Sequence, residues 1–331
     1  MLTAIVPAPM PTDSRIRRGP LLWGALALLV AAAAVVALVL SDGSSAAQVR
    51  GAAALPDQPT PQESADGVEP SPTQARADRG PIVADGCMVG KDGTESDPTC
   101  VYGDKRGKWT VYLFGDSHAM EYFSPLEKLA KENRWRLVVL NKRECSPADT
   151  HVIRLDTGRE YGTCDAWHRI TLRRIGESAG HGTVVLSGDK AARAFAHGQA
   201  LSGGANAAAM ELGYVKTLKK IRRSGLGAVV VKDLPSSPKG IPHCVAEHMH
   251  ELKACAFPRV PDANLEFDAA AARSVPKVTL IDLTPEVCPH ELCRAVIGNA
   301  LTYRDKDHLT ATFARTLEPM LESDFREDGL L

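Results

Sequence analysis

From about residue 81 onward, short apolar runs alternate with segments whose apolar residues recur at helical spacing. Strands are predicted for the apolar, β-branched runs at 109–115, 135–140, 183–188, 227–235 and 277–285. Helices are predicted at 120–134, 165–178, 207–223, 262–274 and 309–323. Strands that are apolar at almost every position are typical of a parallel sheet covered on both faces. Residues 81–331 are therefore expected to form one α/β domain around a central, mostly parallel five-stranded sheet.

A long uncharged segment, residues 20–40, precedes this domain. At about 1.5 Å per residue, it can cross a hydrocarbon core of about 30 Å as a helix. Arg15, Arg17 and Arg18 lie just before it, whereas only the acidic Asp42 lies just after it. The positive-inside rule then places residues 1–19 in the cytoplasm. We expect a transmembrane signal-anchor helix at 20–40, hence a single-pass protein of the cell membrane with its domain extracytoplasmic.

The N-terminal region also allows a second interpretation. Small residues at 44–47 could permit cleavage, in which case 20–40 is a signal peptide and the protein is secreted. Residues 41–80 are rich in Ala, Ser, Pro, Asp and Gln, a composition that buries too little apolar surface to fold. We therefore predict a disordered tether over 41–80 that holds the domain clear of the bilayer.

The overall charge argues against one class of partner. The chain has 39 basic and 40 acidic residues and a net charge of −1. Proteins that bind nucleic acid through its phosphates usually carry a clear basic surplus. We therefore expect no nucleic-acid partner.

The eight cysteines all follow the apolar segment. The compartment outside the membrane does not keep thiols reduced, so an even number of cysteines there indicates disulfides. Proximity along the chain suggests the pairs Cys87–Cys100, Cys145–Cys164, Cys244–Cys255 and Cys288–Cys293. A zinc site is the alternative, but the chain has no CxxC pair, and His248 and His250 supply too few ligands. We expect no metal.

The first chemical signal is the tetrapeptide Gly115-Asp116-Ser117-His118, between the first predicted strand and the first predicted helix. Ligand sites of such folds lie at the carboxyl ends of the strands. A serine there lies at a helix N-terminus, whose free N–H groups favour the oxyanion formed when a hydroxyl attacks a carbonyl. Ser117 could equally be an ordinary N-cap residue. We expect Asp116 to brace the loop and His118 to lie near the cleft.

A second signal favours a catalytic role for Ser117. Asp305 and His308 are separated by two residues, between the fifth predicted strand and the last predicted helix. In a turn, this spacing lets the carboxylate orient the imidazole, which can then take the proton of the serine. A parallel sheet can carry this loop to the edge where the first strand ends. We expect Asp307 to be a solvated carboxylate.

The GDSH sequence after the first strand and the DxxH sequence before the last helix resemble the first and last blocks of the SGNH, or GDSL-like, hydrolases. In particular, the chain resembles the SGNH domains attached to bacterial integral-membrane O-acyltransferases that modify envelope glycans, over about residues 83–325. The resemblance implies a three-layer α/β/α sandwich. It also implies Ser117 as nucleophile, His308 as base and Asp305 as the residue that orients the base.

The middle of the chain departs from the family pattern. SGNH enzymes usually supply a glycine after the second strand and an asparagine after the third as oxyanion donors. Here these positions are occupied by residues 141–146, which contain no glycine, and by Ser187-Gly188-Asp189. The N–H groups of Ser117 and of the Glu144–Cys145 turn could replace these donors, with help from Ser187 or Gly188, and His118 could contact substrate. A different oxyanion hole, a slow enzyme and no enzyme remain open, because one lost donor typically costs about 10²–10³ in rate.

These features predict an extracytoplasmic serine esterase or O-acyltransferase of the SGNH type, without a cofactor. Ser117 would carry an acyl group, expected to be acetyl, that passes to water or to a hydroxyl of a cell-envelope glycan. An integral-membrane partner could supply the acyl donor. The alternative is a weak or inactive SGNH-fold module that binds glycan or acts as a scaffold for a membrane acyltransferase.

Overall fold

The computed structural model describes residues 49–178, 181–327 and 329. The predicted tail at 1–19, the predicted transmembrane helix at 20–40 and residues 41–48 of the predicted tether lie outside these ranges. Across the described residues, no helix is both long enough and apolar enough to cross a bilayer.

The five apolar runs form the parallel centre of a seven-stranded sheet. Its strands are β1 (Met88–Val89), β2 (Val101–Gly103), β3 (Thr110–Gly115), β4 (Arg136–Lys142), β7 (Gly182–Ser187), β10 (Gly227–Val231) and β12 (Thr279–Ile281). They follow the order β1-β4-β3-β7-β10-β12, and β2 also pairs with β4. Only β2 runs antiparallel to its neighbour. The predicted mostly parallel sheet is therefore confirmed, whereas the predicted count of five strands is too low.

The two additional strands are too short to show a pattern in the sequence. β1 has two residues and β2 has three, and most of them are only half-buried. Runs of this length carry no measurable alternation of apolar and polar residues. Both lie along the same side of β4, with β2 beside Arg136–Val138 and β1 beside Asn141–Lys142. They cover what would otherwise be an open edge of the sheet.

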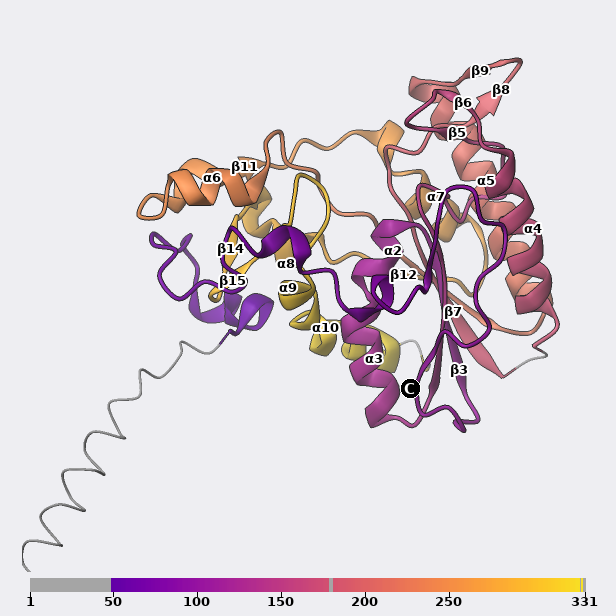
Figure 1. Ribbon diagram of the computed structural model, residues 1–331, viewed down its shortest axis with the longest axis horizontal. Coiled ribbons are helices and arrows are strands. Elements are labelled where there is room, and N and C mark those ends of the chain that lie inside the picture. The colour runs from indigo at the N-terminus through magenta and orange to yellow at the C-terminus, as the bar shows by residue number, and fades with distance from the viewer. Residues whose placement is uncertain (1–48, 179–180, 328, 330–331) are drawn as a thin grey trace, which may run out of the picture. The chain divides into compact units, whose positions relative to one another are not determined.

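Alternate residues of the central strands enter two apolar cores, as the pleat of a strand requires. One core contains Val111, Leu113, Leu137, Val139, Val185 and Val229, with side chains from α3 (Phe123–Glu132), α9 (Ala311–Arg315) and α10 (Glu318–Glu327). The other contains Tyr112, Phe114, Val138, Leu140, Val184 and Leu186, with side chains from α4 (Gly162–Gly176), α5 (Gly203–Arg223) and α7 (Phe267–Ser274). Figure 1 shows α3 and α10 on one side of the sheet and α4 and α5 on the other. The elements therefore form three layers, α/β/α.

The remaining elements are short. They are the helices α2 (Ser117–Glu121), α6 (Ile241–Glu247) and α8 (Thr284–Val287), and the 3₁₀ turns η1 (Gly51–Asp57), η2 (Ala75–Ala77), η3 (Pro81–Val83), η4 (Leu252–Cys255), η5 (Ala263–Leu265) and η6 (Pro289–Glu291). Two-stranded ladders join β5 (Ile153–Arg154) to β6 (Arg159–Glu160), β8 (Phe195–Ala196) to β9 (Gln199–Ala200), β11 (Phe257–Pro258) to β13 (Leu292–Cys293), and β14 (Val296–Ile297) to β15 (Ala300–Leu301). The predicted helix at 120–134 corresponds to α2 and α3, and the one at 309–323 to α9 and α10.

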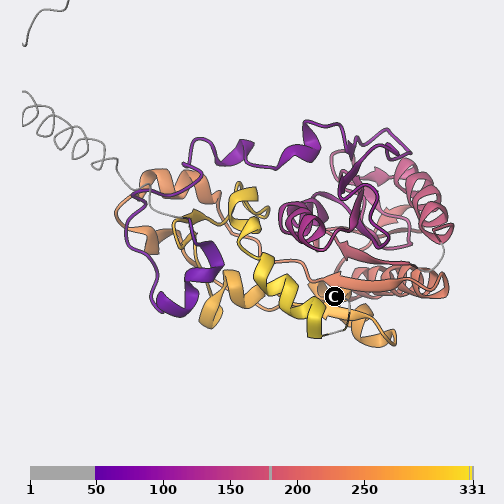
Figure 2. The same cartoon turned by 90° about the horizontal axis from the view of Figure 1, so that it is seen from below.

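Residues 49–80 contradict the prediction of a disordered tether. Their small apolar side chains are buried: Ala52, Ala54, Ala65, Val68 and Ala75. The N–H groups of Arg50 and Gly51 donate to the carbonyl of Gly298, and Glu69 pairs with Ala300. Figures 1 and 2 place this indigo segment on the side of β14 and β15, away from α4 and α5. The composition of the segment predicted disorder because it contains few apolar residues of its own. The apolar surface that covers it comes from residues far away in the sequence.

Arg294 holds one turn of this segment. Its buried guanidinium donates from Nη1 to the carbonyls of Gln58 at 2.7 Å and Thr60 at 3.2 Å. Nη2 donates to the carbonyl of Pro59 at 2.7 Å. A charged donor shared by three carbonyls satisfies backbone groups that have no helix or strand partner there.

The four predicted disulfides are confirmed. Cys87–Cys100, Cys145–Cys164, Cys244–Cys255 and Cys288–Cys293 are all bonded, and no cysteine in the described residues is free. Each pair links segments that lie close in sequence. The second pair ties the loop after β4 to α4, beside the carboxyl edge of the sheet.

Replacing Arg294 tests the docking of residues 49–80. Arg294→Met keeps an apolar stem but leaves three carbonyls without their donor, which should lower the free energy of unfolding by about 3 kcal/mol. Urea unfolding of the full chain measures this. The exposed Arg315→Met is the control and should cost less than about 0.5 kcal/mol. Equal stability of the two variants would contradict the docking role.

Candidate functional site

The turn between β3 and α2 holds Ser117 at the carboxyl edge of the sheet. β3 ends at Gly115, where φ is +153° and a Cβ would lie 1.9 Å from the carbonyl oxygen of Ser187. Only glycine lets β7 approach this closely. Asp116 is the N-cap of α2, and its Oδ1 accepts the N–H of His118 at 2.9 Å. Ser117 is therefore the first residue of the helix.

Hydrogen bonds to the segments on both sides, β7 and β4, brace this turn. Oδ2 of Asp116 accepts the N–H of Asp189 at 2.9 Å, which ties the end of β3 to the residues after β7. Nδ2 of Asn141, in β4, donates to the carbonyl oxygens of Gly115 and Asp116, each at 3.4 Å. Burial raises the pKa of Asp116 to about 6, although the charge of His118 opposes this. The structure thus gives Asp116 the bracing contacts that the sequence suggested.

His308 reaches Ser117 from the loop before α9. Its Nε2 lies 2.9 Å from Oγ of Ser117, and its Nδ1 lies 3.0 Å from Oδ2 of Asp305. Oδ1 of Asp305 accepts the backbone N–H of His308 at 2.8 Å and that of Asp307 at 3.1 Å, so the turn itself fixes this carboxylate. The structure brings the three side chains together in the order of contacts that a hydroxyl, an imidazole and a carboxylate need for acyl transfer.

A second carboxylate, that of Asp307, contacts the same imidazole. Its Oδ1 lies 3.0 Å from Nδ1 of His308, so Asp307 is more than the solvated carboxylate expected from the sequence. Burial disfavours a charged imidazole, but hydrogen bonds with Asp305 and Asp307 raise the pKa of His308 to about 9. His308 is therefore protonated at neutral pH in the resting site. An imidazole with this pKa can accept a proton from a hydroxyl only as the pH rises towards this value.

The backbone N–H groups proposed as oxyanion donors differ in whether they are already hydrogen-bonded. The N–H of Cys145 donates to the carbonyl of Lys142 at 3.2 Å, so the turn after β4 already engages this donor. Glu144, at φ +54°, directs its carboxylate to Lys91, with 2.5 Å between Oε1 and Nζ. The N–H of Ser117 donates to no acceptor within the part of the chain that the structure describes. It stays available at the N-terminus of α2, where an anion is favoured.

Ser187 and Gly188 shape the turn that carries Ser117. Ser187 lies opposite Gly115 in the register of β7 and β3, and its buried Oγ has no hydrogen-bond partner among the described residues. A Cβ on Gly188 would lie 2.7 Å from Cδ of Pro147 and 3.3 Å from Oδ2 of Asp116. A larger residue at position 188 would therefore press on the brace made by Asp116.

Sequence reasoning missed a row of aspartates along this edge. Asp116, Asp189 and Asp233 follow the adjacent strands β3, β7 and β10 and lie one or two residues beyond each strand. His118 lies among them, with Nδ1 2.7 Å from Oδ1 of Asp233 and Nε2 3.9 Å from Oδ1 of Asp189. Since His118 is only 2% exposed, its predicted role as a substrate contact is wrong. The rule that sites form at the carboxyl ends of strands would have identified Asp189 and Asp233.

Three groups of side chains in the described residues are close enough together to be considered for a metal ion. They are His118 with Asp307 and His308, His118 with Asp189 and Asp233, and the exposed His151 with Glu160 and Asp165. In each group an imidazole nitrogen already hydrogen-bonds a carboxylate. We therefore assign no metal to these residues.

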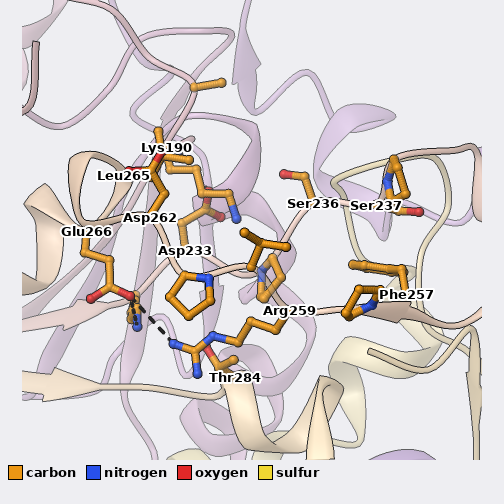
Figure 3. A pocket seen from close by; sticks show the side chains of 17 residues that line it. Lys190, Asp233, Ser236, Ser237, Phe257, Arg259, Asp262, Leu265, Glu266 and Thr284 are labelled. Atoms are coloured by element: carbon orange, nitrogen blue, oxygen red, sulfur yellow. Dashed lines mark hydrogen bonds and ion pairs between the residues drawn. The ribbon is translucent and has the colours of Figure 1, made fainter. Parts of the chain in front are cut away.

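A pocket of about 450 Å³ is lined by Asp233, the partner of His118, whereas Ser117, Asp305 and His308 are not among its lining residues. Figure 3 shows Asp233 and Lys190 close together, and a dashed line joins Arg259 to Glu266. Ser236 and Ser237 also line the pocket, and the N–H of Ser237 donates to the carbonyl of Lys306 at 2.7 Å. The segment that forms one wall of the pocket is thus bonded to the loop that carries His308.

Comparison with known proteins finds one family and similar folds. The profile of the family described as SGNH domain (fused to AT3 domains) matches residues 86–323. The periplasmic domain of a lipopolysaccharide acetyltransferase from Salmonella ser. Paratyphi A is similar in fold, with a TM-score of 0.55, 15% identity and coverage of 80% of this chain and 99% of that chain. A GDSL-like lipase from Bacteroides thetaiotaomicron gives a TM-score of 0.36 and 12% identity, over 67% of this chain and 90% of that chain. No curated protein matches the chain.

The two carboxylates on His308 should be distinguishable by mutation. Asp307→Asn removes one group that raises the pKa of His308, so the reactivity of Ser117 should persist to lower pH. Asp305→Asn removes the orienting group and should slow the reaction by about 10⁴ at all pH values. The rate of Ser117 labelling by a fluorophosphonate, measured against pH, reads both effects.

The exposed Asp92→Asn is the control for these variants, because Asp92 pairs with Arg154 and not with His308. It should leave the pH profile unchanged. If Asp307→Asn also leaves the profile unchanged, the second carboxylate does not act on the imidazole.

Proposed function

This chain belongs to the family of SGNH domains that occur fused to AT3 domains, and we propose that it is an extracytoplasmic serine esterase or O-acyltransferase with Ser117 as nucleophile. One observation carries the proposal. Oγ of Ser117 lies 2.9 Å from Nε2 of His308, whose Nδ1 lies 3.0 Å from Oδ2 of Asp305. A serine activated in this way forms covalent acyl intermediates.

In the proposed reaction, neutral His308 takes the proton of Ser117 while Oγ bonds to the carbonyl carbon of an ester. The carbonyl oxygen becomes an oxyanion near the N–H of Ser117, at the start of α2. When this intermediate collapses, the C–O bond of the ester breaks and His308 gives its proton to the leaving oxygen. Water or another hydroxyl then gives a proton to His308 and bonds to the acyl carbon. The bond from the acyl carbon to Oγ breaks, and His308 returns its proton to Oγ, which regenerates Ser117 and a neutral imidazole.

We propose that the substrate or acceptor is a cell-envelope glycan and that the acyl group is acetyl. The family's association with AT3 domains supports a setting of acyl transfer. The pocket beside the His118–Asp233 pair combines the hydroxyls of Ser236 and Ser237 and the amine of Lys190 with the apolar surface of Phe257. Such a mixture of polar groups and apolar walls suits a sugar ring, which has both hydroxyls and C–H faces.

We also propose that the domain acts outside the cytoplasm, held to the cell membrane by the predicted helix at 20–40. The four disulfides support this, because they form and persist in oxidising compartments. An integral-membrane acyltransferase would supply the acyl donor if the chain is a transferase. An esterase would need no such partner, because its acyl-enzyme is resolved by water.

Labelling tests the nucleophile. A fluorophosphonate probe incubated with the full chain should give a single adduct on Ser117, identified by mass spectrometry of the digested protein. Ser117→Ala should give none. Ser124→Ala, a partly exposed serine in α3, is the matched control and should label like the wild type. An adduct on another serine, or equal labelling of Ser117→Ala, would reject the assignment.

Turnover separates the enzyme from the scaffold alternative. Wild-type protein should hydrolyse p-nitrophenyl acetate at alkaline pH at least about 10³-fold faster than Ser117→Ala, because that variant lacks the covalent route. Added oligosaccharide should then be examined for new acetyl esters by mass spectrometry, since a transferase diverts the acetyl group from water to the sugar. If the two proteins hydrolyse the ester equally slowly, the inactive glycan-binding or scaffold module is favoured.

A further inference from the structure

His118 follows the nucleophile in sequence, yet its side chain is buried behind the site. Its Nδ1 lies 2.7 Å from Oδ1 of Asp233, which is itself only 6% exposed. Asp233 also accepts the N–H of Leu234 on Oδ1 and the N–H of Lys190 on Oδ2, each at 2.9 Å. Donors on both oxygens hold this carboxylate in its ionised form. A second imidazole–carboxylate pair therefore lies behind Ser117.

The ring of His118 packs against the ring of His308. Their centroids are 4.6 Å apart, and the ring planes are inclined by 48°. The reaction proposed above uses His308 as the base and gives His118 no step. At this separation, however, a charge on one imidazole changes the proton affinity of the other.

Charged and titratable groups face His118 from every element packed around it. They are Asp116 and Glu121 of the turn and α2, Asp189 after β7, Asp233 after β10, and Asp307 and His308 of the loop before α9. Lys190 is bonded to Asp233, and the charge of Arg304 acts on Glu121. Burial opposes a charge on His118, but the carboxylates of Asp233 and Asp189 raise its pKa well above the usual value. Burial raises the pKa of Glu121 to about 8, so this side chain is largely neutral at neutral pH. These carboxylates therefore favour an imidazolium at His118, directly beside the ring of His308.

We propose that His118 and Asp233 form a positioning pair, in which a fixed imidazolium lies against His308 and sets the pH range in which His308 acts as a base. Asp305 and Asp307 both favour a proton on His308, whereas the charge of His118 favours its release. The ring of His118 also backs the ring of His308, which keeps Nε2 within reach of Ser117. This role rests on the proposed function, because it requires His308 to be the base.

Nuclear magnetic resonance of the two imidazoles tests the pair without any substrate. The full chain is labelled with nitrogen-15 in its histidines and titrated, and the ring nitrogens of His118 and His308 are followed. In the wild type, His118 should carry protons on both nitrogens at neutral pH. A neutral His118 under these conditions would overturn the proposal, whatever the variants show.

Two variants then remove the charge in different ways. His118→Gln should raise the titration midpoint of His308 by about one pH unit or more, because two charges at this distance interact strongly even at an effective dielectric constant of about 20. Asp233→Asn should act in the same direction, because buried His118 then loses its partner and its proton. Thermal melts identify a variant that does not fold, and the other then decides the question. An unchanged midpoint in the folded variants overturns the proposal.

Labelling of Ser117 by a fluorophosphonate gives the matching kinetic readout. Below the midpoint, His118→Gln should label about tenfold more slowly than the wild type, whereas the two should converge at high pH. The matched control is His168→Gln in α4, another buried imidazole, whose Nε2 contacts the carbonyl of Pro147 at 2.7 Å. It should leave the pH profile unchanged. Wild-type protein that never labels rejects the function proposed above, whereas labelling with an unshifted profile in His118→Gln rejects only the role of the pair.

Discussion

The site depends on one buried carboxylate, that of Asp116. Through Oδ1 it caps the helix that begins at Ser117, and through Oδ2 it binds the N–H of Asp189 beyond the neighbouring strand. The same group thus fixes the direction in which the nucleophile leaves β3 and the path of the loop after β7. Burying a carboxylate is costly, and the two backbone donors offset part of that cost, although burial still raises the pKa of Asp116 to about 6. If this carboxylate were absent, the hydroxyl of Ser117 would lose the rigid support that keeps it opposite His308.

The charged groups around His308 have opposite effects on its pKa, and the balance between them decides the pH at which the imidazole can act as a base. Asp305 and Asp307 hold the imidazole in one orientation, at the cost of raising its pKa to about 9. A base that keeps its proton too firmly cannot activate a serine at neutral pH. The imidazolium proposed for His118 packs against the same ring and opposes the effect of the two carboxylates on its pKa. The two carboxylates therefore orient the imidazole of His308, while the charge proposed for His118 limits how far they raise its pKa.

The departure from the usual SGNH pattern has a structural explanation in β4 and β7. Residues 141–146 supply no glycine at the end of β4, and the amide of Asn141 donates to the carbonyls of Gly115 and Asp116. The N–H of Cys145 is spent on the turn that follows. After β7, Gly188 packs against the side chain of Asp116. These groups stiffen the turn that carries Ser117. In the proposed reaction, the N–H at the start of α2 is therefore the donor that remains for the oxyanion.

The sequence predicts a contact where a short motif contains the interacting residues. It does not predict a contact between residues that lie far apart in the chain and share no motif. Ser117 lies at a strand end within a short motif, and Asp305 and His308 lie in one turn, so strand order alone brings them to a common edge. The contact between His118 and Asp233 joins residues 115 positions apart, and no spacing rule predicts such a pair. The docking of residues 49–80 is similar, because Arg294 and Gly298 supply the partners and lie more than 200 positions away. A composition argument considers a segment by itself, whereas burial depends on the surface that the rest of the chain offers to it.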